Sequence, residues 1–122
     1  MELSLETDGA VAAIRVKGPV SMAETAALSD YLRVARENGA LRCIVDLADC
    51  SWLPTTIVPL LLREAGAFSR SGGALSLSGV ADQNPFLRQA VTSGRLGAYR
   101  TFDEASAGER RAVPVDAPKD DP

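Results

Sequence analysis

A short apolar run, Cys43-Ile44-Val45, is the sequence feature that most constrains how this chain can fold. A strand with one face in water alternates apolar and polar side chains, whereas this run is apolar at every position. It therefore predicts a central strand that is buried under helices. Polar and turn-forming residues follow Leu47, so we expect the strand to end there and Cys50 to lie in the next loop.

Two threonines, Thr55 and Thr56, separate that strand from a second apolar segment that begins at Ile57. A hydroxyl at such a position can accept a hydrogen bond from the free N–H groups of a helix's first turn. We therefore expect a helix capped at one of the threonines, with Pro59 in its first turn; a start as late as Val58 is the alternative. Open α/β sheets tend to place functional groups at such junctions, where a strand ends before a helix.

The rest of the chain alternates between strand and helix patterns. Asp8-Gly9 between two alternating runs predicts an antiparallel hairpin, and Ser21-Met22-Ala23-Glu24 has the spacing of a capping box. Further strands are expected at Ala74–Ser78 and near Ala98, and further helices after Asp82 or Asn84 and after Thr101 or Asp103. The order predicts a single α/β domain whose mixed sheet of about five strands opens with an antiparallel hairpin, with helices packed against it.

Composition places the chain among ordinary globular domains, with 46% hydrophobic and 24% charged residues. We expect one domain over residues 1–111 and a disordered, acidic, proline-rich tail over residues 112–122. No apolar run is long enough to cross a bilayer, and the first residues lack a signal-peptide pattern. We therefore expect a cytoplasmic protein without direct membrane insertion.

Several classes of chemistry are disfavoured. A net charge of −3 argues against nucleic-acid binding, and the absence of histidine removes the commonest general base and zinc ligand. Cys43 and Cys50 are expected to be a reduced pair. Asp46, at the predicted strand end, and Asp49, in the predicted turn, fit turn chemistry better than a metal site. Gly72-Gly73 lies between a helix and a strand, so it is interpreted as a connector rather than a phosphate loop. We expect no cofactor, no metal and no enzymatic activity.

Two aromatic residues are assigned to the core. Trp52, the only tryptophan, is expected to pack over the sheet edge, with a half-exposed anchor for a partner as the alternative. Phe86 is expected on the buried face of the third helix, together with Leu87, Ala90 and Val91.

Three stretches together resemble a STAS domain, the family of anti-sigma factor antagonists and related bacterial regulators. They are Val16-Lys17-Gly18 before the first helix, Ile44-Val45-Asp46-Leu47 with its threonine junction, and Gly72–Val80 with Phe86–Val91, followed by Gly94, Leu96 and Phe102. The resemblance covers about residues 3–108, nearly the whole domain. It implies a STAS-like fold and a cytoplasmic signalling protein that regulates transcription by binding another protein.

In that family the junction reads Asp-Ser-Ser/Thr-Gly-Leu, and an anti-sigma factor kinase phosphorylates its first serine or threonine. Pro54 stands here at the Asp position, with Thr55 and Thr56 at the two hydroxyl positions. Ile57 replaces the glycine and Val58 the leucine, so a hydroxyl survives whereas the acidic neighbour and the glycine do not. Ser21 stands where the family often has an Asp before the first helix.

The resemblance implies a binding module for an anti-sigma factor kinase, with Thr55 as the phosphoacceptor and Thr56 as the second candidate. The predicted contact surface comprises Ser21, Trp52, Pro54, Thr55, Ile57 and Val58. If Ile57 and Val58 are exposed, such an apolar junction favours constitutive protein contact.

Other functions stay open at this point. One is a STAS scaffold without phosphorylation, as in a stressosome-like assembly or on a transporter ATPase. Another is a small enzyme or ligand-binding domain with a pocket at the strand ends. Thr55 also fits a purely structural role as a helix cap. The sequence does not fix the oligomeric state, and a homodimer is compatible with it.

Overall fold

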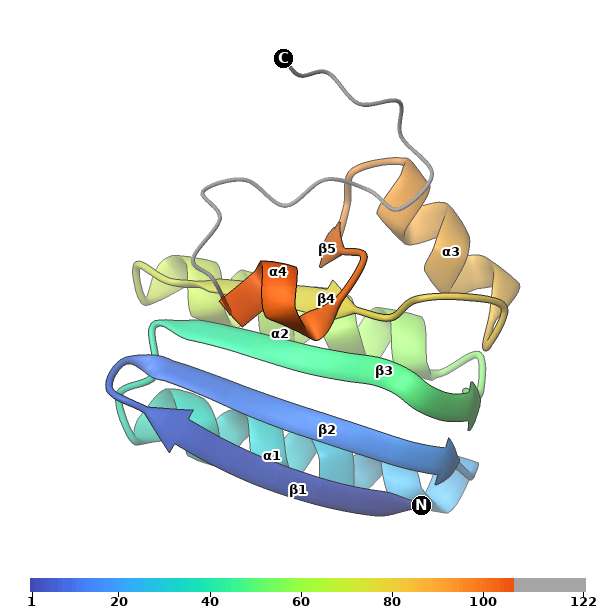
Figure 1. The fold of residues 1–122 in the computed structure, drawn as a ribbon, viewed down its shortest axis with the longest axis horizontal. Coiled ribbons are helices and arrows are strands. Elements are labelled where there is room, and N and C mark those ends of the chain that lie inside the picture. Colours follow the sequence, from blue (N-terminus) through green and yellow to red (C-terminus); the bar gives the residue numbers. More distant parts are fainter. Residues whose placement is uncertain (107–122) are drawn as a thin grey trace.

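The computed structural model describes residues 1–106, which form a five-stranded sheet with four α-helices and one 3₁₀ turn (Figure 1). The elements in chain order are β1 (Glu2–Asp8), β2 (Val11–Pro19), η1 (Met22–Glu24), α1 (Thr25–Glu37), β3 (Arg42–Trp52), α2 (Ile57–Arg70), β4 (Ala74–Ser78), α3 (Pro85–Thr92), β5 (Gly97–Tyr99) and α4 (Phe102–Ser106). The predicted α/β fold is confirmed. The predicted domain end at residue 111 and the tail over 112–122 lie outside the described residues.

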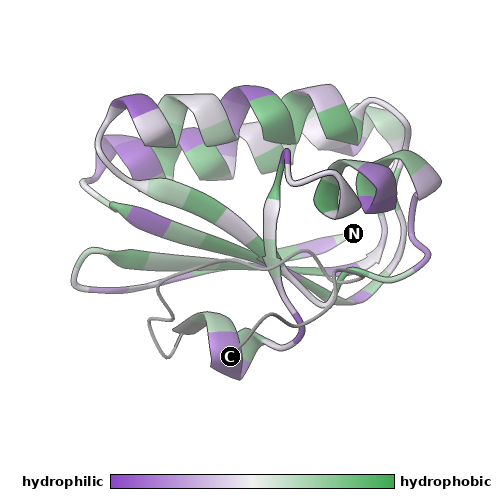
Figure 2. Ribbon diagram, turned by 90° about the horizontal axis from the view of Figure 1, so that it is seen from above, coloured by the Kyte–Doolittle hydropathy of each residue, from purple (hydrophilic) through white to green (hydrophobic). Residues whose placement is uncertain are grey.

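The strands follow one another across the sheet in the order β1-β2-β3-β4-β5. The predicted hairpin is confirmed: β1 pairs antiparallel with β2, and Asp8 faces Val11 across the two-residue loop Gly9-Ala10. Gly9 has a φ of 64°, and a glycine at the first loop position suits the right-handed twist of the two strands. The other neighbours pair in parallel. Right-handed crossovers in a sheet of this order place the connecting helices on one face, where α1 and α2 lie, whereas α4 lies on the other (Figure 2).

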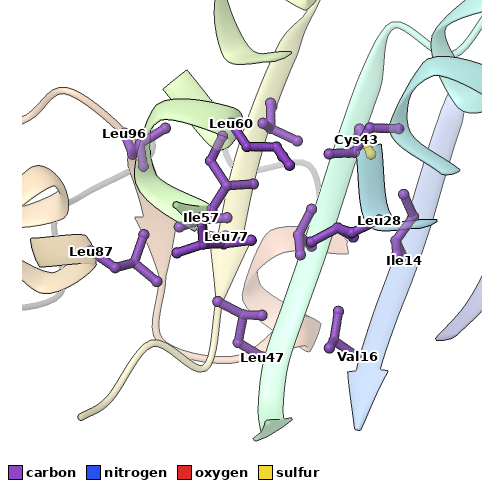
Figure 3. Close-up of a cluster of buried hydrophobic side chains, with 14 of the residues drawn as sticks. Ile14, Val16, Leu28, Cys43, Leu47, Ile57, Leu60, Leu77, Leu87 and Leu96 are labelled. Atoms are coloured by element: carbon purple, nitrogen blue, oxygen red, sulfur yellow. The ribbon is translucent and has the colours of Figure 1, made fainter. Parts of the chain in front are cut away.

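The main core fills the space between the sheet and the helices on that face (Figure 3). Ile14, Val45 and Leu77 point from neighbouring strands into it, and each is at most 1% exposed. Leu28 and Leu32 of the predicted α1 stripe are fully buried against them, while Tyr31 is partly buried. A smaller cluster of Ile44, Tyr99 and Ala105 lies on the opposite face, under α4.

Strand β3 is longer than the sequence pattern predicts. The expected end after Leu47 is wrong, because β3 continues to Trp52, and Cys50 is a buried strand residue rather than a loop residue. The pairing of β3 with β4 ends at Asp46 and Ser78, so the last part of β3 has only β2 beside it. Polar residues are acceptable there, because a strand with one neighbour reaches solvent.

The two aspartates that were assigned to the strand end and a turn both lie within β3. Asp46 is 7% exposed and is held by three groups. One carboxylate oxygen accepts hydrogen bonds from the Ser78 hydroxyl at 3.1 Å and the Ala48 N–H at 3.2 Å, and the other lies 3.6 Å from the Arg15 guanidinium. Asp46 therefore joins β2, β3 and β4 and is committed to the fold.

Gly72 and Gly73 connect α2 to β4, as expected, and the two positions require glycine for different reasons. Gly72 is required for its backbone conformation, because its φ of 85° lies in the left-handed region, whereas a Cβ there would meet no atom within 4 Å. A Cβ at Gly73 would overlap the carbonyl oxygen of Leu41, which accepts a hydrogen bond from the Ala74 N–H at 2.7 Å. The backbone at the start of β3 thus comes too close to Gly73 for any side chain.

We predict that Gly72→Ala costs about 1 kcal/mol of unfolding free energy, which is the penalty of the left-handed conformation. Gly73→Ala should cost about 3 kcal/mol, because the added methyl group forces the backbone at residue 73 away from the Leu41 carbonyl group. Urea unfolding of both variants tests this pair. Equal losses at the two positions would contradict the close approach at Leu41.

Cys43 lies in the core with no exposed surface and is a free thiol, as is Cys50. Burial, with a smaller contribution from the negative charge of Glu64, raises the pKa of the Cys43 thiol to about 12. Burial also raises the pKa of Cys50. Since an unfolded cysteine has a pKa of about 8.5, the thiol of Cys43 stays protonated in the folded chain at pH values where it ionises in the unfolded chain.

This raised pKa predicts a pH-dependent contribution to stability. The contribution is fully present below about pH 8.5 and is lost as the pH rises towards 12, because the unfolded state releases the proton first. The stability difference between the wild type and Cys43→Ala should therefore shrink over that window. Urea unfolding at several pH values measures it, with Val45→Ala, a buried residue that carries no titratable group, as the control. A constant difference for Cys43→Ala would contradict the buried, protonated thiol.

Candidate functional site

The strand-to-helix junction lies at the carboxyl end of β3, where Thr55 and Thr56 are both exposed. Thr56 takes the N-cap position and α2 begins at Ile57, so the earlier of the two predicted helix starts is confirmed, with Pro59 in the first turn. The Thr56 side chain makes no capping hydrogen bond. Thr55 precedes the cap, so its interpretation as a helix cap is wrong.

Backbone turns satisfy the start of α2 in place of a hydroxyl cap. The Ile57 N–H donates to the Pro54 carbonyl oxygen at 3.0 Å. The Val58 N–H donates to the Thr55 carbonyl oxygen at 3.5 Å. Pro59 has no N–H to donate. Both threonine hydroxyls are left uncommitted: among residues 1–106, neither has a hydrogen-bond partner.

The apolar residues of the junction are buried rather than exposed. Ile57 is fully buried, Val58 is 8% exposed, and Pro54 is also buried. The condition for constitutive apolar contact, exposed Ile57 and Val58, is therefore not met. The reason is that the first turn of α2 packs Ile57 and Val58 into the main core, which fixes the helix start but leaves these two side chains little surface for a partner.

Trp52 ends β3 with 51% of its surface exposed, so its assignment to the core is wrong. Its backbone is held, because its carbonyl oxygen accepts a hydrogen bond from the Val20 N–H at 3.0 Å. Phe86 is the second aromatic residue wrongly assigned to the core: it is 55% exposed in the first turn of α3, whereas Leu87, Ala90 and Val91 are buried as predicted. Within residues 1–106, both side chains are thus left about half exposed.

Ser21 is exposed and lies next to Val20, so the hydrogen bond from Val20 to Trp52 brings it to the same end of the sheet as the threonines. Its predicted capping box is confirmed. The Ser21 hydroxyl accepts from the Glu24 N–H at 3.2 Å, and the Ser21 N–H donates to the Glu24 carboxylate at 2.9 Å. That donated bond holds the pKa of Glu24 below its usual value.

Asn84 fixes the junction from a distance of 30 residues along the chain, and the sequence indicated only its role as a helix cap. Its side chain is 2% exposed. The amide nitrogen donates to the carbonyl oxygens of Leu53 and Pro54, both at 3.0 Å. The amide oxygen caps α3 by accepting from the N–H groups of Phe86 and Leu87 at 2.8 and 3.1 Å. One side chain thus joins the end of β3 to the start of α3.

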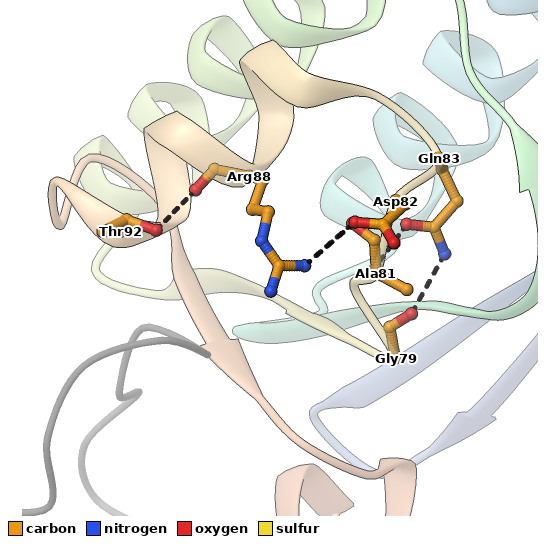
Figure 4. A network of polar contacts seen from close by, with 6 residues as sticks. All are labelled: Gly79, Ala81, Asp82, Gln83, Arg88 and Thr92. Carbon is orange, nitrogen blue, oxygen red and sulfur yellow. Dashed lines mark hydrogen bonds and ion pairs between the residues drawn. The ribbon is translucent and has the colours of Figure 1, made fainter.

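Gln83 reinforces this connection through the loop between β4 and α3 (Figure 4). Its amide nitrogen donates to the carbonyl oxygens of Leu47 and Gly79, and its amide oxygen accepts from the Ala81 N–H at 2.7 Å. The backbone carbonyl oxygen of Gln83 accepts a hydrogen bond from the Leu53 N–H at 3.1 Å. The loop and the strand end are therefore held as one unit beneath the threonines.

Other chemistry has little support among residues 1–106. No group of three or more His, Cys, Asp or Glu side chains there could hold a metal ion. A hollow of about 380 Å³ lies against α3, lined by Asp82, Pro85, Arg88, Gln89 and Thr92, and it does not include Thr55. Within the same described part, no helix is both long and apolar enough to span a bilayer.

We predict that Asn84→Asp separates the two roles of this residue. A carboxylate still caps α3, but it cannot donate to Leu53 and Pro54 and instead faces their carbonyl oxygens. The expected cost is about 2 kcal/mol, together with faster amide hydrogen exchange at Ile57. Gln89→Glu, the same chemical change at an exposed site of α3, should change stability by less than about 0.5 kcal/mol. An Asn84→Asp variant as stable as the wild type would rule out the clamp.

Comparison with known proteins finds the same fold in solved structures of anti-sigma factor antagonists. No family model matches the sequence, and no curated protein sequence matches it. Solved structures do match. The unphosphorylated form of the antagonist SpoIIAA is 16% identical with a TM-score of 0.71, over 87% of this chain and 94% of that one. An anti-sigma factor antagonist from Mycobacterium paratuberculosis is 17% identical with a TM-score of 0.74, over 89% and 93%.

The phosphorylated form of SpoIIAA from Bacillus gives a TM-score of 0.70 at 16% identity, over 87% of this chain and 97% of that one. These likenesses extend over nearly the full length of each protein, and they agree with the resemblance found in the sequence. The chain has the fold of a STAS domain, the fold of the anti-sigma factor antagonists.

Proposed function

We propose that this chain is a regulatory module of the anti-sigma factor antagonist type, which binds a protein partner through the end of the sheet that carries Thr55. The observation that carries the proposal is the state of Thr55. It is exposed, its hydroxyl has no partner within residues 1–106, and it follows a backbone that Asn84 and Gln83 hold in place. A fixed, accessible hydroxyl suits a group that another protein has to find and modify.

The proposed partner is an anti-sigma factor kinase, and the proposed setting is the cytoplasm. In this role the chain is a binding partner and a substrate of the kinase, with no catalytic activity, cofactor or nucleic-acid contact of its own. The similarity to SpoIIAA, a protein solved in phosphorylated and unphosphorylated forms, supports a switch of this kind.

Phosphorylation of Thr55 would act through charge. A phosphate adds nearly two negative charges, and no charged residue occurs between Cys50 and Leu62 to neutralise them. The first N–H groups of α2 are engaged by turns or absent, so they offer few donors to a phosphate. The added charge would therefore stay at the surface, where it would repel an acidic partner and would lose hydration without compensation against an uncharged one. Binding is switched off while the fold is unchanged.

A second candidate function is a STAS scaffold that is never phosphorylated, as part of a multiprotein assembly or beside a transporter ATPase. Pro54 and Ile57 favour it, because they stand where the resembled motif has its acidic residue and its glycine, and both are buried. A kinase that reads those two positions would find neither. Thr56 is the alternative acceptor if phosphorylation occurs.

The phosphoacceptor is tested with an anti-sigma factor kinase from the same genome and ATP, and the product is analysed by mass spectrometry. We expect one phosphate on the wild type and on Thr56→Val, and none on Thr55→Val. Valine keeps the shape of threonine without the hydroxyl, so the matched pair isolates the acceptor. Phosphate on Thr55→Val would shift the assignment to Thr56, and no phosphate on any form would favour the scaffold.

A further inference from the structure

Five large apolar side chains are substantially exposed among residues 1–106, and the three most exposed ones lie at the end of the sheet that carries Thr55. These are Met22 at 64%, Phe86 at 55% and Trp52 at 51%. The other two, Leu41 at 46% and Val34 at 39%, lie elsewhere. Single exposed apolar residues are ordinary, whereas a group of them at one place marks a contact surface.

Hydrogen bonds bring the three segments together although they are about 30 residues apart in the sequence. The Val20 N–H donates to the Trp52 carbonyl oxygen at 3.0 Å, which places Met22 two residues from that contact. On the other side of Trp52, Asn84 binds Leu53 and Pro54, and the Phe86 N–H donates to Asn84. The ends of β2 and β3 and the start of α3 accordingly lie at the same side of the molecule (Figure 1).

The three segments are also uncharged. Val20–Ala23, Cys50–Leu62 and Gln83–Leu87 contain no charged residue, although 24% of the whole chain is charged. The core of a protein interface is typically depleted of charge and enriched in aromatic residues and methionine. Charged residues adjoin these segments at Glu24, Asp49, Asp82 and Arg88, so the uncharged part has a charged border. Over the uncharged part, a strongly charged partner surface would lose hydration without gaining an ion pair.

We propose that Met22, Trp52 and Phe86 form one apolar docking surface around Thr55, and that its occupant is an anti-sigma factor kinase whose facing surface is apolar and uncharged. This inference rests on the proposed function and names the side chains that carry the contact. Trp52 is the central anchor, since it lies between the other two segments and offers the largest aromatic surface. The contact is held by burial of apolar area, so its affinity changes little with salt, while a phosphate on Thr55 places charge within it.

The test uses the chain with 5-fluorotryptophan, which gives a single ¹⁹F resonance because Trp52 is the only tryptophan. Each anti-sigma factor kinase purified from the same genome is titrated without nucleotide, and the dissociation constant is measured at low and high salt. We expect a shift of the Trp52 resonance on binding. Trp52→Ala should weaken the affinity by about thirtyfold or more, and Met22→Ala and Phe86→Ala by about fivefold or more.

Two exposed apolar residues provide matched controls. Leu41 precedes the opposite end of β3, about 35 Å from Trp52 along an extended strand, and Val34 lies about 18 Å from Met22 along a helix axis. Leu41→Ala and Val34→Ala remove similar exposed surface, and both variants should bind within about twofold of the wild type. Urea unfolding of all five variants shows that each one is folded.

The outcomes separate this inference from the proposed function. If a kinase binds and phosphorylates the chain but the three alanine variants keep wild-type affinity, the docking surface is wrong and the proposed function stands. A strong loss of affinity with salt also overturns the apolar contact. If no kinase binds, both proposals fail. A Trp52 resonance that shifts with the concentration of the chain alone, with a matching change in sedimentation, assigns the surface to a second copy and overturns the proposal.

Discussion

The side chain of Asn84 makes the contacts on which the arrangement of the candidate site depends. β4 has already ended at Ser78 and β3 ends at Trp52, so the carbonyl groups of Leu53 and Pro54 have no sheet ladder to enter. A buried carbonyl without a partner is costly, and the Asn84 amide donates to both at 3.0 Å, with the Ile57 N–H as a second donor to Pro54. The same amide caps α3. The position of the threonines is therefore fixed by the start of a helix that comes 30 residues later.

The sequence predicted those features that depend on a few neighbouring residues. The Gly9 turn, the capping box of Ser21 and Glu24, and the start of α3 at Asn84 and Pro85 each require contacts within about four positions. The buried run of Cys43 to Val45 also needed no distant information, because an all-apolar strand has to be covered on both faces. These local signals were sufficient to order the elements and to identify the junction.

The features that could not be predicted all depend on how elements distant in the sequence end or pack against one another. Trp52 and Phe86 have the composition of core residues, yet they are exposed because no element of the described chain extends over them. Cys50 is buried because β3 continues along β2 after β4 has stopped. Ile57 and Val58 turn inward because α2 packs against the sheet from its first turn. Hydropathy gives the preference of a side chain for burial, and the fold decides whether that preference can be met.

A rigid junction limits how this end of the molecule can act as a switch. Hydrogen bonds from Asn84, Gln83 and Val20 hold the backbone on both sides of Trp52, and Ile57 anchors the following helix in the core. A large rearrangement would break several of these contacts at once, and a surface phosphate does not supply the free energy to replace them. What changes easily is the charge of the surface. In the proposed switch, two charges added to the exposed hydroxyl of Thr55, on a backbone held in place, would alter binding and leave the fold as it is.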